Sequence, residues 1–455
     1  MASTSTRAEI WRERIADLWA NMWRWVLMAL GAVAATYLLL DRGVQNGSML
    51  AVVIAVFVIG AAVSGSKPLA IALLSMPLLL IPQRIGLGGG DLSVSDAALA
   101  AAFGTAVLLG KRPFSAPLRS LLWINLFYQF TTLFTVIVNP YTANTVEWFH
   151  AWLLVSGALV VGWALGAGGY ARLALTLIVV TACVMAVLTI AQGALNFASG
   201  NFGPAFPTWP FELHKNFVGT VLAFAAIVVY LNPDWVGWTK AHASLAFWLM
   251  VVAILLTQSR QALIGLMAAI IVAVLRHSTT RRSRLVLLLL IPAGWMIVNM
   301  VMEQLGSDNR HNSVLQRLDW FKEVYAYWLE SPVFGHGLRY WYNVGAIPYQ
   351  PPQAEMEMLA SAGVVGLIGF LVMWIAVLVV LWRIDPRFGT LAVAVLLCRF
   401  VQGQFDLFWI AAQVSIPFVI AGVCLGAMAR EAKQDPAALV DARRSDAALR
   451  RPRVG

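Results

Sequence analysis

The sequence predicts an all-α integral membrane protein, a polytopic bundle of about 12–14 transmembrane helices. Of its residues 60% are hydrophobic and only 12% are charged, and the mean hydropathy is +0.76, which excludes an ordinary soluble protein. Mostly apolar runs of about 18 residues recur between Trp25 and Met428. These runs lack the polar alternation of membrane strands, so they predict helices, which satisfy their own backbone hydrogen bonds in lipid.

The apolar runs divide the chain into fourteen predicted spans. In chain order they are 25–40, 48–65, 68–83, 92–110, 119–138, 147–167, 173–194, 216–231, 242–258, 261–275, 285–302, 355–382, 388–405 and 407–428. If one or two of these are reentrant or interfacial, the count falls to twelve or thirteen. We therefore expect a cytoplasmic segment at 1–24, a polytopic domain at 25–428 and a basic cytoplasmic tail at 429–455.

The lysines and arginines orient this bundle. With the N-terminus in the cytoplasm, 23 of the 32 basic residues fall on the cytoplasmic side, 8 on the external side and one, Arg399, within a span. Cytoplasmic loops of membrane proteins carry this excess of positive charge. Topology and contact with anionic lipid thus explain the net charge of +10, so we expect no nucleic-acid partner. Both termini are expected in the cytoplasm.

Two predicted external loops are long, at about 195–215 and 303–354. Binding and catalytic residues lie preferentially on loops that a rigid scaffold positions, so we expect the site there. In the second loop, apolar residues recur at helical spacing until Pro332 stops the run. We expect an amphipathic helix at 314–330, on the outer membrane face or packed over the bundle.

The sequence has no pattern for a metal or a nucleotide. Its cysteines, Cys183, Cys398 and Cys424, all fall within predicted spans, where we interpret them as apolar packing residues. A phosphate-binding glycine loop, a metal-ligand cluster and a Ser-His-Asp order are all absent from the sequence. We therefore expect no metal and no cofactor, and we exclude ATPases and hydrolases of these types.

Two external arginines are candidates for binding phosphate. Arg260 lies at a tight turn between the ninth and tenth spans, and an arginine at the edge of the hydrocarbon is costly without a partner. Arg317 lies on the amphipathic helix. A guanidinium group matches phosphate oxygens in geometry and stays charged. The alternatives are contact with lipid phosphates for Arg260 and a solvated helix face for Arg317.

Further candidates lie at the start of the eighth span. His214, Lys215 and Asn216 stand where a helix N-terminus and cationic side chains can bind an anionic group, and the alternative is an ordinary interfacial helix cap. Among the other external basic residues, those that we assign to substrate binding are Arg84, Arg310 and Arg339.

Three residues are candidates for catalysis by proton transfer. His336 lies between two glycines, which let the backbone approach a ligand closely, although a simple loop histidine is the alternative. Glu355 and Glu357 begin the twelfth span. The helix dipole already favours carboxylates in a first turn, and the functional interpretation makes one of them a general base.

Four short motifs follow one another in the second half of the chain. They read Gln258-Ser259-Arg260, then Arg317-Leu318-Asp319-Trp320, then Pro332-Val333-Phe334-Gly335-His336-Gly337, then Glu357 to Gly366. In this order and loop placement they resemble the O-antigen ligase and polymerase family of bacterial membrane glycosyltransferases. His214-Lys215-Asn216 is similar to the motif of the exopolysaccharide-polymerase branch. By motif, the resemblance covers about residues 200 to 370.

This resemblance implies a GT-C-like fold with its long external loop between the eleventh and twelfth spans. It also implies the assembly of cell-surface polysaccharide on the outer face of the bacterial cytoplasmic membrane. The donor would be an undecaprenyl diphosphate-linked glycan, and the acceptor a glycan or a lipid-linked group. In such a metal-independent transfer, Arg260 and Arg317 would hold the diphosphate while a base activates the acceptor hydroxyl.

The chain departs from the family at the expected base. Where the family has a histidine, the spacing from Gly363 places Pro352-Gln353 in this chain. The remaining candidates for the base are Glu355, Glu357, His336 and His214. Two other functions stay open, namely a transporter or flippase of lipid-linked sugars and a non-catalytic family member. The sequence also leaves open whether the acceptor makes the protein a ligase or a polymerase.

Overall fold

The computed structural model describes residues 47–64, 67–85, 92–277, 295, 313–343, 350–409 and 411–434. This part of the chain is helical, apart from loops and one isolated β-bridge between Arg84 and Ser93. Within it, six helical segments are long and apolar enough to cross a membrane: Ala116–Val138, Thr142–Gly168, Ala171–Ala198, Lys240–Thr257, Ala354–Arg383 and Ala412–Gln434. The predicted class, a helical multi-pass membrane protein, is confirmed.

Every predicted span that falls on described residues contains a helix. The helices are α2 (Gly47–Val63), α3 (Ala70–Leu78), α4 (Val94–Leu109), α5 (Ala116–Val138), α6 (Thr142–Trp152), a π-turn η1 (Leu153–Gly157), α7 (Ala158–Gly168), α8 (Ala171–Ala198), α9 (Lys215–Leu231), α10 (Lys240–Thr257), α11 (Arg260–His277), α13 (Ser313–Glu330), α14 (Tyr340–Asn343), α15 (Ala354–Arg383), α16 (Pro386–Gln402) and α17 (Ala411–Gln434). The predicted span 25–40 lies outside the described residues, and so does 285–302 apart from Trp295.

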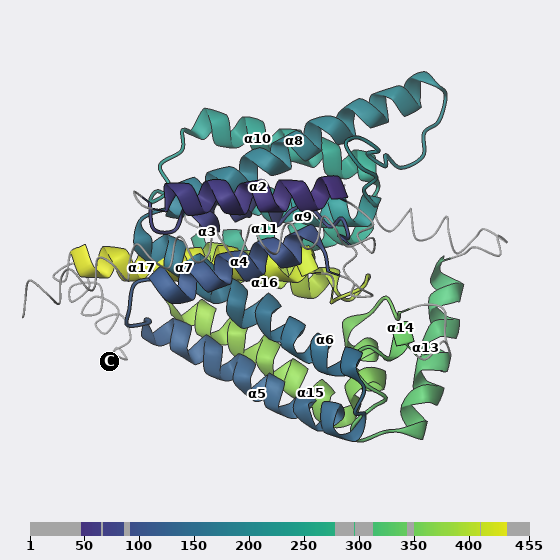
Figure 1. Ribbon diagram of the computed structural model, residues 1–455. Coiled ribbons are helices and arrows are strands. Elements are labelled where there is room, and N and C mark those ends of the chain that lie inside the picture. Colours follow the sequence, from purple (N-terminus) through teal and green to yellow (C-terminus); the bar gives the residue numbers. More distant parts are fainter. Residues whose placement is uncertain are drawn as a thin grey trace, which may run out of the picture.

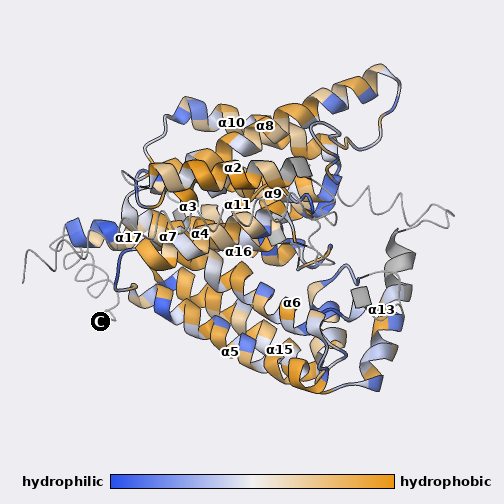
Figure 2. Cartoon of the chain, in the orientation of Figure 1, coloured by the Kyte–Doolittle hydropathy of each residue, from blue (hydrophilic) through white to orange (hydrophobic). Residues whose placement is uncertain are grey.

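The long helices lie side by side, and α13 and α14 lie together at one end of the bundle (Figure 1). We call this end the loop end. Figure 2 shows hydrophobic residues along most of the length of the helices, with hydrophilic residues gathered on α13 and towards the two ends, and many of the large hydrophobic side chains are exposed. Helices α5 and α15 pack together, as do α7 and α17, and α11 and α16. A hydrophobic surface between polar ends fits a protein that lies in lipid.

The centre of the bundle is the pair α7 and α17. Glycines spaced four residues apart on both helices let their backbones touch. A Cβ atom on Gly162 would lie 2.0 Å from the carbonyl oxygen of Val419, and one on Gly426 would lie 2.3 Å from that of Trp163. These two segments are also the most buried of the six candidate spans. Larger residues at these positions would separate the helices.

The span predicted at 355–382 is a helix, but it is not continuous. Gly363 has φ +64° and ψ −167°, which breaks α15 after its first turns. A Cβ atom there would lie 2.3 Å from the carbonyl oxygen of Val333, because the loop backbone occupies that space. Gly369, by contrast, lies at a contact between helices, since a Cβ atom there would lie 1.9 Å from Oγ1 of Thr131 on α5.

The predicted amphipathic helix in the large loop is confirmed as α13. It ends at Glu330, just before Pro332. Val324 is fully buried in a small cluster with aromatic residues of the following loop, whereas Tyr325 and Leu329 are more than half exposed. Of the two predicted arrangements, the buried face supports α13 packed over the bundle, where it contacts α15.

Candidate functional site

The loop motif at 332–337 docks on the break in α15. Four backbone hydrogen bonds of 2.8–3.2 Å connect the two segments. They are, with the donor first, Val364 to Pro332, Val365 to Val333, His336 to Ala360 and Gly337 to Ser361. Gly335, with φ +67°, has no room for a side chain, since a Cβ atom would lie 2.4 Å from the carbonyl carbon of Ser361. The glycines of this motif therefore serve close backbone docking, which fixes the start of α15.

The same loop is tied to the connection between α5 and α6. Asn139 donates a hydrogen bond of 3.1 Å to the carbonyl of Gly335, and the backbone N–H of Leu338 donates one of 2.9 Å to Oδ1 of Asn144. Tyr141 lies against Gly337, and burial raises the pKa of Tyr141 to about 12, so its phenol stays neutral. The loop is held from two sides.

His336, a predicted catalytic residue, contacts two tyrosines that fix the loop in place. Its Nε2 lies 2.7 Å from the carbonyl oxygen of Tyr327, a geometry in which this nitrogen donates a hydrogen bond. Its ring stacks on Tyr340 with centroids 4.7 Å apart. These contacts connect α13 to the loop, and they leave Nε2 of His336 unsuited to accept a proton.

Gln353 belongs to the pair Pro352-Gln353, which the sequence predicted at the position of the family's histidine, and here Gln353 caps α15. Its Oε1 accepts a hydrogen bond of 2.7 Å from the backbone N–H of Met356. Glu355 accepts hydrogen bonds from the side chains of Gln353 and Gln404, the latter at 2.8 Å. Ala354 also donates its N–H to the carbonyl of Gly403 at 2.9 Å. Glu355 therefore connects the start of α15 to the turn that follows α16.

Glu357 differs from Glu355 in burial and in its partners. The residue is only 3% exposed, and its Oε1 accepts a hydrogen bond from Gln350. Its Oε2 is buried without a hydrogen-bond partner in the described part of the chain. Glu357 lines a cavity of about 10 Å³, the size of about one water molecule. Of the two carboxylates, only Glu357 combines burial with an oxygen available to accept a proton.

Two cations lie near one another at the starts of α9 and α11. The tight turn predicted before Arg260 is present, with Gln258 in the left-handed region at φ +52°. Lys215 is the first residue of α9, and a Cβ atom on Gly219 in the next turn would lie 2.7 Å from Cβ of Ser259. Burial, and then the positive charge of Arg260, lower the pKa of Lys215. The fold thus brings together two cations 45 residues apart.

Beside Lys215, His214 caps a helix, which the sequence left open as the alternative to anion binding. It is the N-cap of α9, and its Nδ1 accepts a hydrogen bond of 3.3 Å from the backbone N–H of Asn216. The segment before it is fixed to the neighbouring loop, because Gln83 donates a hydrogen bond of 3.2 Å to the carbonyl of Glu212. Arg84, the next residue, is exposed.

A single turn joins the cationic and the acidic parts of the site. Gln261, next to Arg260, donates a hydrogen bond to the carboxylate of Asp406. Two residues before Asp406, Gln404 contacts Glu355. The turn at 403–406 therefore lies between the start of α11 and the start of α15, so the predicted Arg260 and Glu355 lie at neighbouring helix ends.

Arg399, the predicted intramembrane arginine, binds the connection into α17. It is fully buried and donates hydrogen bonds to Oε1 of Gln413 at 2.9 Å, to the carbonyl of Leu407 at 2.9 Å and to the carbonyl of Phe408. Its guanidinium also lies 4.7 Å from the ring centroid of Phe408. Arg399 thus satisfies the backbone of the connection into α17, which local sequence does not reveal.

Of the other arginines that the sequence assigned to the site, Arg339 forms an ion pair, and the side chains of Arg310 and Arg317 lie outside the described residues. Arg339 forms an ion pair of 2.9 Å between its Nε and Oε2 of Glu147. Arg317 lies on α13, but its side chain lies outside the described residues, as does the whole of Arg310. Their predicted roles in binding or catalysis therefore stay predictions.

Sequence reasoning missed a buried group of charges on α4 and α6. Nε2 of His150 lies 2.8 Å from Oδ1 of Asp96, and its Nδ1 lies 3.3 Å from Oε1 of Glu147. A signal was present, since Glu147 and His150 stand three residues apart at the start of the span predicted at 147–167. Ionisable residues inside a span are costly and mark functional sites.

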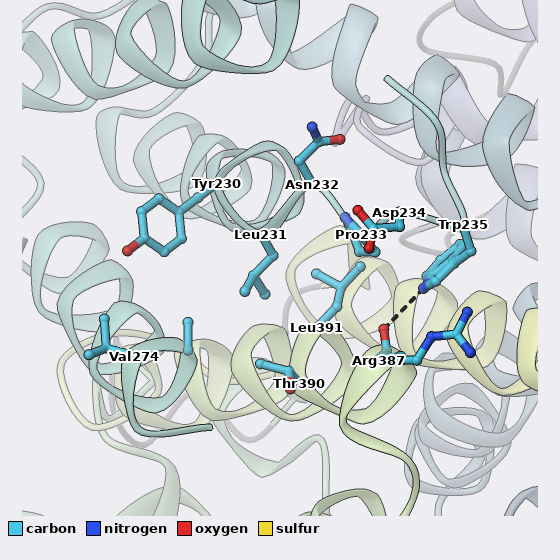
Figure 3. A pocket seen from close by; sticks show the side chains of 11 residues that line it. Tyr230, Leu231, Asn232, Pro233, Asp234, Trp235, Val274, Arg387, Thr390 and Leu391 are labelled. Atoms are coloured by element: carbon cyan, nitrogen blue, oxygen red, sulfur yellow. Dashed lines mark hydrogen bonds between the residues drawn. The ribbon is translucent and has the colours of Figure 1, made fainter. Parts of the chain in front are cut away.

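The larger hollows lie elsewhere. One of about 350 Å³ lies at the end of the bundle opposite the loop end, where α9, α11 and α16 meet, and Trp235 there donates a hydrogen bond of 3.0 Å to the carbonyl of Arg387 (Figure 3). Another, of about 590 Å³, is an apolar groove along α4, α5 and the π-turn. None of the predicted site residues lines either of them.

Comparison with known families bears on this arrangement. A model of the O-antigen ligase family matches residues 245–371. The chain resembles the O-antigen ligase family. The O-antigen ligase-like segment runs from α10 into α15 and includes Arg260, the docked 332–337 motif and Glu357. The predicted resemblance is confirmed, and it indicates a membrane protein of polysaccharide assembly. Among curated proteins, the comparison found no match.

Proposed function

We propose that the protein is a glycosyltransferase of the O-antigen ligase or polymerase type. It transfers a glycan from undecaprenyl diphosphate to an acceptor hydroxyl on the outer face of the bacterial cytoplasmic membrane, without a metal. The observation that carries this proposal is that Arg260 and Lys215 lie near one another at two helix N-termini, where α9 packs against the turn before Arg260. Helix N-termini and paired cations both favour an anion, and a diphosphate would relieve the repulsion between these like charges.

In the proposed reaction the oxygen of the acceptor hydroxyl attacks the anomeric carbon of the donor sugar. The bond from sugar to diphosphate breaks, and the diphosphate leaves with the electron pair. Arg260 stabilises the charge that develops on the leaving group, as preorganised donors do in a site that excludes water. Further groups that we propose for donor contact are Lys215, His214, Asn216, Arg84, Arg310 and Arg317.

We propose Glu357 as the base that receives the proton of the acceptor hydroxyl. Its support is the buried Oε2, which has no hydrogen-bond partner among the described residues, next to a cavity that fits one oxygen atom. Glu355 is less suited, because both of its carboxylate oxygens accept hydrogen bonds from glutamine side chains. Glu355 instead positions the start of α15.

The test is transfer from a labelled undecaprenyl diphosphate-linked oligosaccharide by the purified protein in nanodiscs. Wild type should move the label to an added oligosaccharide acceptor, whereas Arg260→Ala should be slower by about a hundredfold or more. Arg387→Ala is the matched control, since it removes an exposed ion pair with Glu431 at the opposite end and should transfer like wild type.

Products are separated by size. A ladder would identify a polymerase, and a single product a ligase. The proposal fails if wild type, reconstituted in sealed vesicles with donor and acceptor, leaves the label on its carrier and moves it across the bilayer. That result would identify a transporter.

A further inference from the structure

Five ionisable residues form a network beneath the loop end, and four separate parts of the fold supply them. They are Asp96 on α4, Glu147 and His150 on α6, Arg339 in the loop before α14, and Glu357 on α15. The three carboxylate residues are 3–7% exposed. Removing charged groups from water costs free energy, so their burial here indicates a function or a strong structural need.

The contacts of the network run in one line from α4 to the docked loop. His150 lies between two carboxylates, 2.8 Å from Asp96 and 3.3 Å from Glu147. The second oxygen of Glu147 lies 2.9 Å from Nε of Arg339. At the other end, Ser93 donates its hydroxyl to Oδ2 of Asp96 at 2.7 Å, at the N-terminus of α4.

A cavity connects this line to Glu357. Glu147 and Glu357 both line the hollow of about 10 Å³, together with Tyr128 and Trp409. The buried Oε2 of Glu357 has no hydrogen-bond partner in the part of the chain that the structure describes. One water in this hollow would have two carboxylates as partners, and buried waters bind where polar partners of this kind are available.

Charge balance indicates that the network holds a proton. The network contains three carboxylates and two basic groups, Arg339 and His150, so one negative charge remains even when His150 is protonated. On the other side of Glu357, the buried Arg399 and the half-buried Asp406 are opposite charges and add no net charge, and Tyr128 is a phenol. A proton on one carboxyl group makes the whole group neutral, which lowers the cost of burial.

We propose that these residues form a proton relay between Glu357 and the loop-end terminus of α4. The proposal rests on the proposed transfer, in which Glu357 takes the acceptor proton as the bond to the sugar forms and the diphosphate departs. The resting proton must leave Glu357 first, so that its carboxylate is ionised when the acceptor arrives. That proton passes through one water to Glu147. Protonated His150 releases the proton of Nε2 to Asp96, from which it reaches solvent beside Ser93, and His150 is then reprotonated from Glu147. One proton thus leaves the network and one enters it in each turnover. Histidine suits this step because its two nitrogens face different carboxylates.

The first test needs no substrate. Infrared spectra of the protein in nanodiscs near neutral pH should contain a protonated-carboxyl band that shifts in D₂O. This band should be absent in Glu357→Gln and shifted in frequency in Glu147→Gln. Glu431→Gln, at an exposed ion pair, should leave it unchanged. A wild-type spectrum without a protonated-carboxyl band, or a band that both network variants leave unchanged, would overturn the relay.

The second test is kinetic. Glu147→Gln should lower kcat by about tenfold or more at unchanged donor KM, raise the solvent deuterium isotope effect and move the pH profile. Arg339→Gln breaks the same ion pair but keeps the carboxylate, so it should change kcat less. Folded Glu147→Gln with wild-type kcat, isotope effect and pH profile would overturn the relay. Absence of transfer by wild type would instead overturn the proposed function, and the infrared result would still decide where the proton lies.

Discussion

The two charged regions of the loop end differ in the signs of the charges that they bring together. At the starts of α9 and α11 the fold brings together like charges, Lys215 and Arg260. Beneath the start of α15 it pairs carboxylates with Arg339 and His150, in contacts of 2.8–3.3 Å. Like charges favour an anionic ligand, whereas the mixed group needs only a proton to become neutral. In our proposals, anion binding and proton transfer therefore occupy separate regions, with the turn at 403–406 between the starts of α11 and α15.

The largest effect is expected at the carboxylate. Glu357→Gln keeps the size of the side chain but cannot accept a proton, so kcat should fall by about a hundredfold to ten-thousandfold. Single-turnover transfer at saturating donor measures this directly. Glu355→Gln is its matched control and should lose less than about tenfold. Equal losses in both variants would mean that the two carboxylates share one role.

The cation pair gives the next largest effect. Arg260→Ala should lower kcat/KM by about a hundredfold to a thousandfold, because the leaving diphosphate loses a preorganised partner. Arg260→Lys restores a charge without the planar fork and should recover only part of this loss. Steady-state transfer at several donor concentrations separates these cases, and a wild-type value for Arg260→Ala would remove the cation pair from the mechanism.

A substitution at the docked loop tests whether the regions depend on their common support. Gly363→Ala places a side chain at φ +64° against Val333, at a cost of about 2–4 kcal/mol from strain and overpacking. The thermal unfolding midpoint in detergent should fall, and so should transfer. Gly104→Ala is the control, because a Cβ atom there meets nothing within 4 Å. A similar midpoint for both variants would contradict the docking role.

The smallest effect is expected from Lys215→Gln, about tenfold in donor affinity. Because the pKa of Lys215 is lowered, donor binding should weaken as pH rises through that pKa, at lower pH than for an ordinary lysine. In Arg260→Ala the repulsion is removed, so this pH dependence should move upward. Binding titrations across pH measure both shifts, and a dependence that stays in place would show that the two cations do not interact.

The sequence predicted the helices and the tight turn before Arg260 well. Apolar runs and charge clusters are local signals, so they locate α5, α8 and α13 within a few residues. The predicted resemblance to the O-antigen ligase family is also confirmed.

The features that the sequence did not reveal all depend on contacts between distant segments. The break at Gly363 requires the backbone of Val333, which lies thirty residues earlier in the chain. Glycine in a membrane helix ordinarily indicates helix packing, as at Gly369, whereas Gly363 packs against the backbone of the loop. Likewise, Asp96 and His150 are 54 residues apart, and neither position alone indicates the other.

Donor binding and transfer measured on the same nanodisc samples test the division of roles most directly. Wild type, Arg260→Ala and Glu357→Gln would be titrated with labelled undecaprenyl diphosphate-linked oligosaccharide and then given acceptor. We predict that Arg260→Ala is weakened in both binding and transfer, whereas Glu357→Gln binds the donor like wild type but transfers at least about a hundredfold more slowly. Equal loss of donor binding in both variants, or full transfer by either, would contradict the account.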